Sequence, residues 1–180
     1  MDLVVERMAS PVGTIQFVYD DTALRALDFL DYDARLHRLL RTHYGTYTLA
    51  ATERRSPYHD AIEAYFAGDL GAIDTVRVET GGTSFQREVW RALRGIRAGE
   101  TMSYGALAHQ IGRPAAVRAV GLANGANPVG IVVPCHRVIG ANGSLTGYGG
   151  GLPRKQWLLE HERRGAEPSL FADRPLDAIV

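Results

Sequence analysis

The stretch from Thr101 to Gly125, TMSYGALAHQIGRPAAVRAVGLANG, decides the fold of the second half of this 180-residue chain. Its pattern predicts one helix over Tyr104–Ile111, which the tight turn Gly112-Arg113-Pro114 brings to an end. A second helix is predicted over Ala115–Ala123. Two short helices joined by such a turn are typical of a helix-turn-helix, although many unrelated helical corners share this pattern.

The second of these helices is unusual because most of its side chains are very small: Ala115, Ala116, Ala119, Gly121 and Ala123. Small side chains allow the backbone of a helix to lie close to another surface. That surface is either a neighbouring helix, which is the commoner case, or a groove of DNA.

Downstream of the two helices, the stretch IVVPCHRVIG at residues 131–140 contains the only cysteine of the chain, Cys135. Its apolar start predicts a short buried strand over Ile131–Val133. A buried free cysteine is usually an inert part of the core. Here a proline fixes the backbone before the thiol, polar residues follow it, and the glycine-rich loop ANGSLTGYGGG comes soon after. These features favour a nucleophilic Cys135.

A nucleophilic thiol needs a base or positive surroundings, because the thiolate is the reactive form. His136 is adjacent and can act as this base, and a carboxylate would then orient its ring. The second half of the chain offers few carboxylates: Glu88, Glu100, Glu160 and Glu162. Glu162 lies on a predicted last helix, from Leu152 to about Arg164, from which it can fold back toward the thiol.

Residues 1–81 predict a separate α/β domain that begins with a β-meander. Its elements are strands at Leu3–Met8, Thr14–Tyr19 and Ala23–Phe29, a helix over Ala34–His43, a polar connection over residues 45–55, a helix opened by Ser56-Pro57 and closed by Gly68, and an alternating strand at Thr75–Thr80. Gly81-Gly82 marks the boundary to a second domain at 82–165. That domain opens with Thr83-Ser84-Phe85-Gln86, which resembles a capping box, and a tail of little periodicity follows it over 166–180.

The composition excludes several classes of protein. No apolar run is long enough for a membrane helix, the first residues do not resemble a secretory signal, and one cysteine cannot form an internal disulfide or a cysteine-rich zinc site. These features fit a cytoplasmic protein. The net charge is zero, but residues 82–165 carry 11 Arg and Lys against 4 Asp and Glu. Such a block is typical of a polyanion-binding region, although a chance excess of solvated arginine explains the count equally well.

Four motifs together closely resemble the O6-alkylguanine-DNA alkyltransferases, also called methylated-DNA–protein-cysteine methyltransferases, and the bacterial Ogt type is closest in layout. They are SYGALA at 103–108, RPAAVRAVGLANGANP at 113–128, PCHRV at 134–138 and GSLTGYGGGLPRKQWLLEHE at 143–162. The match runs almost without gaps from Thr83 to Glu162. It is weaker in the first half, where it includes SPVGTI at 10–15 and YFAG at 65–68.

The resemblance implies an α+β fold: an N-terminal ribonuclease H-like α/β domain with antiparallel strands, followed by a mostly helical, winged helix-turn-helix-like domain that carries the active site. It also implies catalytic roles for four residues. Cys135 matches the alkyl acceptor, His136 the histidine that deprotonates it through a water, and Glu162 the glutamate that orients the histidine. Asn127 matches the asparagine that bridges the helix-turn-helix to the active-site turn.

The same resemblance implies contacts with DNA and with the damaged base. Tyr104 matches the tyrosine that contacts the flipped base and the rotated phosphate, and Arg118 matches the arginine that fills the gap in the stack. The carbonyls of Cys135 and Val138 would accept from the guanine amino group, and the Gly149 N–H would donate to O6. The expected DNA- and substrate-binding set is Ser103, Tyr104, Ala116, Arg118, Ala119, Gly121, Val138 and Gly149.

The function that the resemblance implies is direct reversal of DNA damage. The protein would flip O6-alkylguanine, and also O4-alkylthymine, out of duplex DNA and transfer the alkyl group irreversibly to Cys135, once per molecule. It would use no metal or other cofactor, bind double-stranded DNA through the minor groove, and be a monomer in solution that can bind DNA cooperatively. Because relatives hold zinc through paired Cys and His, the single cysteine predicts no zinc site here.

Two other functions remain open from the residues. The first is a non-enzymatic helix-turn-helix module in which the cysteine is incidental, and it predicts that Cys135→Ala leaves function intact. The second is a Cys/His hydrolase or a thiol redox enzyme, which would turn over repeatedly. Redox work usually needs a second thiol, which this chain does not have.

Overall fold

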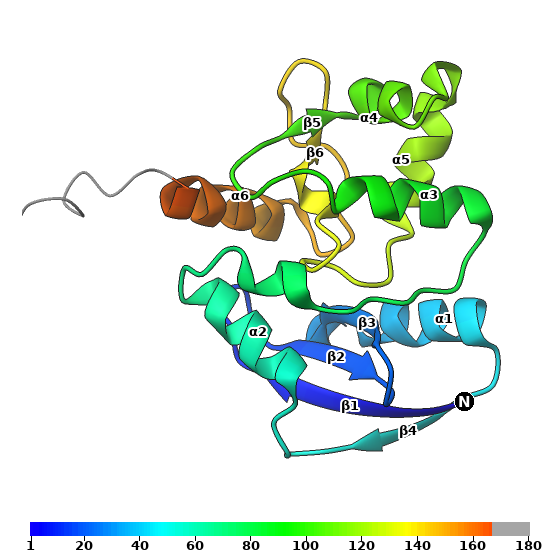
Figure 1. The fold of residues 1–180 in the computed structure, drawn as a ribbon, viewed down its shortest axis with the longest axis vertical. Helices are drawn as coiled ribbons and strands as arrows, with labels where there is room; N and C mark the ends of the chain where they lie inside the picture. Colours follow the sequence, from blue (N-terminus) through cyan, green and yellow to red (C-terminus); the bar gives the residue numbers. More distant parts are fainter. Residues whose placement is uncertain (167–180) are drawn as a thin grey trace, which may run out of the picture.

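The computed structural model describes residues 1–166, which form an N-terminal half and a C-terminal half stacked on one another (Figure 1). Residues 167–180, nearly all of the predicted tail, lie outside the described residues. The N-terminal half consists of β1 (Asp2–Met8), β2 (Ile15–Tyr19), β3 (Leu24–Phe29), the 3₁₀ turn η1 (Leu30–Tyr32), α1 (Asp33–Tyr44), β4 (Thr48–Ala51), α2 (Pro57–Phe66) and the 3₁₀ turn η2 (Ala72–Thr75).

The three predicted N-terminal strands are confirmed and form an antiparallel meander, in which β2 pairs with both β1 and β3. The polar connection predicted over residues 45–55 is wrong in part. Thr48–Ala51 forms β4, which pairs in parallel with β1 and gives the strand order β3-β2-β1-β4. This edge strand is almost entirely exposed, so its sequence lacks the apolar alternation that marks a half-buried strand.

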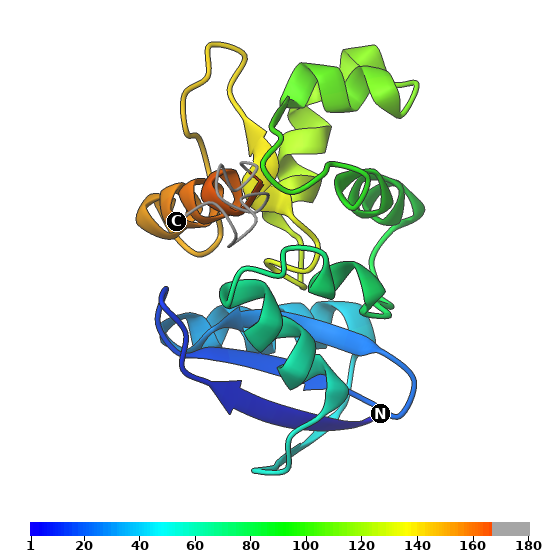
Figure 2. The same ribbon diagram turned by 60° about the vertical axis from the view of Figure 1, so that its left-hand side comes forward.

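The two faces of this sheet are covered by different parts of the chain. On one face, α1 packs through Leu36 and Leu40, as expected for the predicted helix. The other face contributes Leu27 to a larger core that α2 and the C-terminal half share (Figure 2). Backbone bonds join the halves: Leu27 N donates to Pro128 O at 2.9 Å, and Gly130 N donates to Leu27 O at 3.0 Å. The N-terminal sheet therefore holds the segment that leads to Cys135.

The start of α2 agrees with the sequence pattern. The Ser56 hydroxyl accepts a hydrogen bond from the backbone N–H of His59, and Pro57 occupies the first helical position. The strand predicted over Thr75–Thr80 is wrong. Its first residue ends η2, and the rest meets β3 only at an isolated bridge between Leu24 and Val78. After this bridge the chain runs away from the sheet toward the C-terminal half, so it forms no further pairing with β3.

The C-terminal half is mostly helical, as predicted. It consists of α3 (Ser84–Leu93), β5 (Met102–Ser103), α4 (Tyr104–Gln110), the 3₁₀ turn η3 (Pro114–Ala116), α5 (Val117–Gly125), the 3₁₀ turn η4 (Cys135–Arg137), β6 (Val138–Ile139) and α6 (Leu152–Ala166). The capping box at the start of α3 is confirmed: Thr83 Oγ1 accepts from Gln86 N at 3.1 Å, and Gln86 Oε1 accepts from Thr83 N at 2.9 Å.

The helix-turn-helix is formed by α4 and α5, with one correction. The second helix begins at Val117 rather than Ala115, because the residues after the turn form η3. Helix α3 lies against both helices, and Trp90 Nε1 donates to the carbonyl of Ala123 at 2.8 Å (Figure 1). The position of α5 is therefore fixed by the body of the C-terminal half.

The buried strand predicted over Ile131–Val133 is wrong, although these residues are buried. They form a tight turn in which Val132 N donates to Gly130 O and Val133 N donates to Val129 O. Ile131 has a φ of 69°, a conformation that is unusual for a β-branched residue. An apolar run of this length predicts that its residues are buried. Its backbone hydrogen bonds are made within the turn, however, so the run does not pair with another strand. Among residues 1–166, no helix is long and apolar enough to cross a membrane.

Candidate active site

Cys135 is the first residue of η4, and Pro134 precedes it as the N-cap. Its side chain is buried and lines a very small cavity, of about 10 Å³. The residues around this cavity come from both halves of the chain: Asp28, Phe29, Arg35, Asn127, Gly130, Cys135, Tyr148, Gly149 and Gly150. A space of this size holds about one water molecule. The thiol is therefore enclosed, and a molecule as large as a nucleobase reaches it only if this wall opens.

His136, the residue after Cys135, forms a fully buried pair with Glu162. His136 Nε2 lies 2.8 Å from Glu162 Oε1, and neither side chain is exposed. Burial alone would raise the pKa of Glu162, but His136 and Arg137 hold it well below its usual range. An ionised carboxylate only accepts hydrogen bonds, so Nε2 carries the proton toward Glu162. The structure thus confirms the expected proximity of these two residues.

The other ring nitrogen of His136 is free to act as a base. Within residues 1–166, Nδ1 is buried and has no hydrogen-bond partner. Burial lowers the pKa of His136, although Glu162 opposes this effect. The ring is therefore neutral near pH 7, and its unprotonated Nδ1 can accept a proton.

Glu162 is held by three further donors that the sequence interpretation does not include. Arg137 donates through Nε at 2.9 Å and Nη2 at 2.8 Å, Tyr65 donates its hydroxyl at 2.8 Å, and Gly99 N donates at 3.4 Å. Arg137 also donates to the carbonyl of Ile96, so its guanidinium is buried but satisfied. Tyr65 belongs to α2, and the N-terminal half therefore contributes directly to the position of the catalytic candidates.

Asn127 and Asn124 hold the backbone around the thiol. Asn127 Nδ2 donates to Val133 O at 2.8 Å, and its Oδ1 accepts from Val129 N at 3.0 Å. Asn124, which the sequence interpretation does not single out, donates to the carbonyl of Cys135 at 3.4 Å. Burial raises the pKa of the Cys135 thiol, and the Asn127 side chain partly opposes this rise. Asn127 thus joins the end of α5 to the turn before Cys135.

A buried lysine fixes the glycine-rich loop against the site. Lys155 Nζ donates to Val138 O at 2.6 Å and to Thr146 O at 2.7 Å, and burial lowers the pKa of Lys155 to about 8. Tyr104 donates its hydroxyl to the same Thr146 carbonyl at 3.3 Å. The Val138 carbonyl, expected to bind substrate, therefore already has one donor. A carbonyl oxygen has two lone pairs, so it can still accept a second.

Arg35 of α1 covers the cavity from the N-terminal side. Its guanidinium donates to Asp28 Oδ2 at 2.6 Å and to the carbonyls of Gly125 and Asn127, each at 3.2 Å. A methyl group added at Gly149 would lie only 2.5 Å from Arg35 Cζ. The substrate contact that the resemblance implies for Gly149 uses only its backbone N–H, but a larger side chain at this position requires Arg35 to move first.

The expected DNA-binding residues of α5 lie on an open surface. Arg118 and Ala119 are exposed, and Ala116 and Gly121 are partly buried. Gly121 lies against the ring of Tyr104. Ser103 caps α4 by accepting from Ala106 N at 3.1 Å. The exposed residues of α5 are Val117, Arg118, Ala119, Leu122 and Gly125, so this face combines small side chains and one arginine with two apolar side chains, of which Leu122 is 71% exposed. Within residues 1–166, no three His, Cys, Asp or Glu side chains are grouped as metal ligands.

Two family models match this chain and together cover nearly all of the described residues. The model for the ribonuclease-like domain of 6-O-methylguanine DNA methyltransferase matches residues 3–80, and the model for the DNA-binding domain of the same protein matches residues 84–164. This chain belongs to the 6-O-methylguanine DNA methyltransferase family. Its α+β fold, with a ribonuclease-like N-terminal part and a mostly helical DNA-binding part, is the fold of that family.

Individual members of this family are similar over almost the whole chain. The methylated-DNA–protein-cysteine methyltransferase of Salmonella typhimurium is 53% identical, over 89% of this chain and 95% of its own length. The enzyme of the same name from Mycolicibacterium paratuberculosis is 50% identical, over 89% of this chain and 93% of its own length. The crystal structure of Mycobacterium tuberculosis OGT in complex with DNA has a TM-score of 0.74 and 44% identity, over 92% of this chain and 95% of that chain.

Proposed function

We propose that this protein repairs alkylated DNA by accepting the O6-alkyl group of a guanine on Cys135. The observation that carries the proposal is the buried series of Cys135, His136 and Glu162 in a chain of this family. The Cys135 thiolate attacks the alkyl carbon, a carbon–sulfur bond forms, and the bond from carbon to O6 breaks. The electron pair of that bond remains on the guanine, which takes up a proton and is restored.

Each residue of the buried series has a distinct task in this reaction. Glu162 holds the His136 ring so that Nδ1 is unprotonated, and Nδ1 receives the thiol proton through a water. Burial raises the pKa of the Cys135 thiol, so the free protein keeps the thiol protonated and unreactive. The thioether product is chemically stable, because a base such as His136 cannot break its carbon–sulfur bond. Each molecule therefore reacts once.

The substrate reaches Cys135 as a base flipped out of duplex DNA. The exposed face of α5, with Arg118 and Ala119, lies in the minor groove, where small side chains permit a close approach. Arg118 fills the gap in the base stack, and Tyr104, Val138 and Gly149 contact the extruded base. Extrusion costs a few kcal/mol, and less for a base whose pairing is already damaged. O4-alkylthymine is a second substrate of the same chemistry.

The two halves divide the work. Residues 82–165 bind DNA and accept the alkyl group, and residues 1–81 support the site through Tyr65 and Arg35. The protein acts in the cytoplasm, is a monomer in solution that can bind DNA cooperatively, and needs no cofactor.

The stoichiometry of the reaction tests this proposal. Wild-type protein and Cys135→Ala are each incubated with an excess of duplex DNA that contains O6-methylguanine, and restored guanine is counted per protein molecule. We expect one guanine per wild-type molecule and none for Cys135→Ala. Repeated turnover would indicate a hydrolase, and equal repair by both proteins would indicate that the cysteine is incidental.

A further inference from the structure

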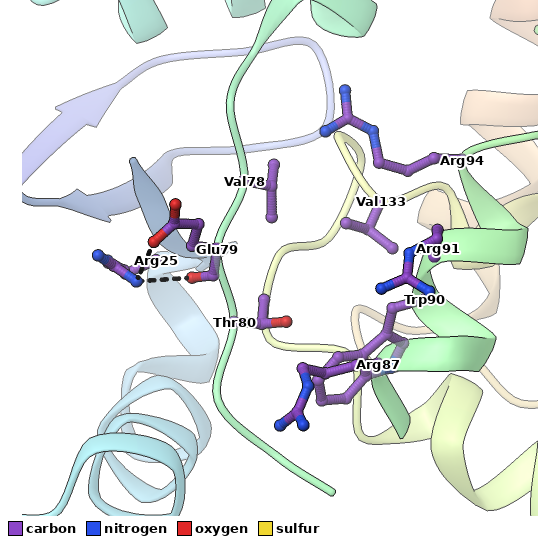
Figure 3. Close-up of a pocket in the computed structure, with 9 residues that line it drawn as sticks. All are labelled: Arg25, Val78, Glu79, Thr80, Arg87, Trp90, Arg91, Arg94 and Val133. Carbon is purple, nitrogen blue, oxygen red and sulfur yellow. Dashed lines mark hydrogen bonds and ion pairs between the residues drawn. The ribbon is translucent and has the colours of Figure 1, made fainter. Parts of the chain in front are cut away.

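A second and larger cavity, of about 460 Å³, lies between α3 and the segment 78–80 (Figure 3), and Cys135 is not among the residues that line it. Arg87 and Arg91 of α3 and Arg94, the C-cap residue of that helix, form one wall, and Val78, Glu79 and Thr80 form the other. The cavity is within the size range of sites for small ligands or for part of a larger one. No step of the proposed reaction uses it.

The three arginines on this wall have helical spacing and no acidic partner. Arg87, Arg91 and Arg94 are four and then three residues apart, so Arg87 and Arg91 lie on one face of α3 and the helical backbone of its C-cap places Arg94 on the same side. Arg87 donates to the carbonyl of Gly82, and Arg94 donates to the carbonyls of Ile73, Asp74 and Val76. Among residues 1–166, no carboxylate forms an ion pair with any of the three. Neighbouring like charges repel, so this face favours an anion that can compensate them.

The opposite wall does not supply that anion. Glu79 is the only acidic residue that lines the cavity, and it already pairs with Arg25 at 3.2 Å and with Arg77. Arg25 is paired in addition with Asp20 at 2.8 Å. The charges of this wall are therefore satisfied among themselves. Asp74 lies close enough to Arg94 to stabilise its charge, whereas Arg87 and Arg91 have no ion-pair partner among residues 1–166.

The arginine face is rigidly joined to the proposed DNA-binding helix. Trp90, which lies beneath the cavity, donates to the Ala123 carbonyl of α5 at 2.8 Å. The bonds from Arg94 to three carbonyls fix one end of the arginine row. From Arg87 to Arg94 the helix rises by about 10 Å, since each residue adds about 1.5 Å. A single DNA strand carries a phosphate for about every 3.4 Å of duplex axis, so this row is long enough to face more than one phosphate.

We propose that Arg87, Arg91 and Arg94 bind backbone phosphates of DNA at a second contact, outside the surface of α5. The proposal rests on the proposed function, because it requires that the chain acts on DNA. A guanidinium group can donate two parallel hydrogen bonds to the oxygens of one phosphate. A row of arginines is therefore suited to bind successive backbone phosphates. The second contact would extend the DNA footprint over α3 and toward the N-terminal half.

The salt dependence of DNA binding tests this second contact. The variant Arg87→Gln/Arg91→Gln removes two charges and keeps Arg94, which holds the segment 73–76. Arg91→Gln alone breaks no hydrogen bond of the described residues and guards against misfolding of the double variant. The control Arg163→Gln/Arg164→Gln removes the same charge from exposed positions at the end of α6, away from α3 (Figure 1).

Each lost phosphate contact lowers the slope of log K against log salt by about 0.9. We therefore expect the slope for undamaged duplex DNA to fall by about 2 in the double variant, by about 1 in Arg91→Gln, and to stay at the wild-type value in the control. An unchanged slope in the double variant, or an equal loss in the control, would overturn the proposal. So would calorimetric binding of inorganic phosphate at this site with an unchanged DNA slope, since the site would then take a small anion.

Reaction with free O6-benzylguanine separates this proposal from the proposed function. The free base needs no DNA contact, so we expect the double variant to form the Cys135 adduct at the wild-type rate. Absence of the adduct in every protein, together with the reduced slope, would support the phosphate contact and contradict the alkyl transfer. A normal adduct with an unchanged slope would contradict the phosphate contact alone.

Discussion

The Nε2 atom of His136 lies 2.8 Å from Oε1 of Glu162, and the same oxygen accepts a hydrogen bond from the hydroxyl of Tyr65 at 2.8 Å. Helices α2 and α6 are far apart in the sequence, and they meet at the carboxylate that holds His136, the proposed general base. The tautomer and the orientation of His136 depend on this one carboxylate, whereas burial keeps the ring neutral.

Glu162→Gln should both slow alkyl transfer and destabilise the fold. The change leaves Arg137 without its buried counter-charge, and breaking a buried pair costs about 3–5 kcal/mol. Urea denaturation measures the loss. The low pKa of Glu162 adds a pH signature: its stabilisation is present above the unfolded pKa of about 4.3 and is lost as the pH falls through the folded value. An equal acid sensitivity of wild type and variant would contradict this account.

Tyr65→Phe should have a smaller effect than Glu162→Gln, because it removes one donor and leaves His136 and Arg137 in place. A hydrogen bond to a charged group contributes about 1.5–3 kcal/mol. We expect a loss of stability of that order and a reduced rate of transfer from free O6-benzylguanine. A wild-type rate would indicate that the N-terminal half does not help to position Glu162.

The rate of alkyl transfer should resist acid more than an ordinary histidine base allows. Burial lowers the pKa of His136, so its base form persists below the usual value of about 6.5. The rate of transfer from free O6-benzylguanine should therefore decline only below that pH. In His136→Ala, the pH–rate profile should no longer show this decline on the acid side. A decline centred at or above pH about 6.5 would contradict the assignment of His136 as a buried neutral base.

Gly149→Ser should slow the reaction unless Arg35 is also changed. The added side chain would collide with the Arg35 guanidinium, which Asp28 and two carbonyls hold in place. We expect Arg35→Ala to restore the rate in the Gly149→Ser background, with a coupling energy of about 0.5–3 kcal/mol between the two changes. Strictly additive effects on the rate would show that the two residues do not interact.

Arg118→Ala should impair repair of duplex DNA more than reaction with the free base. Its side chain is exposed and is not among the residues that line the thiol cavity, so we expect the chemistry at Cys135 to be unaffected. Parallel rates with duplex O6-methylguanine and with free O6-benzylguanine measure the difference. An equal loss with both substrates would show that Arg118 acts on the fold or the site rather than on DNA.

Local patterns allowed much of this structure to be predicted, and long-range contacts explain what was missed. The capping box at Thr83 and the proline start of α2 depend on neighbouring residues, so the sequence determines them. Strand β4 could not be recognised, because its stability comes from pairing with β1 rather than from its own residues. Ile131–Val133 was correctly expected to be buried, but a local turn replaces the strand.

The site follows the same rule. His136 and Cys135 are adjacent in the sequence, and the few carboxylates of the second half pointed to Glu162, which the family resemblance also implies. Tyr65 and Arg35 belong to the other half of the chain, and no spacing in the sequence relates them to the thiol. Arg137 stood next to His136 and could have been recognised, since a charged residue inside an apolar run needs a buried partner.

The most direct test of the account is the intact mass of the protein after reaction with O6-benzylguanine, followed by peptide mapping. We predict a gain of one benzyl group per molecule, located on Cys135 and absent from Cys135→Ala. A protein that stays unmodified, carries the group at another residue, or releases it and reacts again would contradict the assignment of Cys135 as a single-use alkyl acceptor.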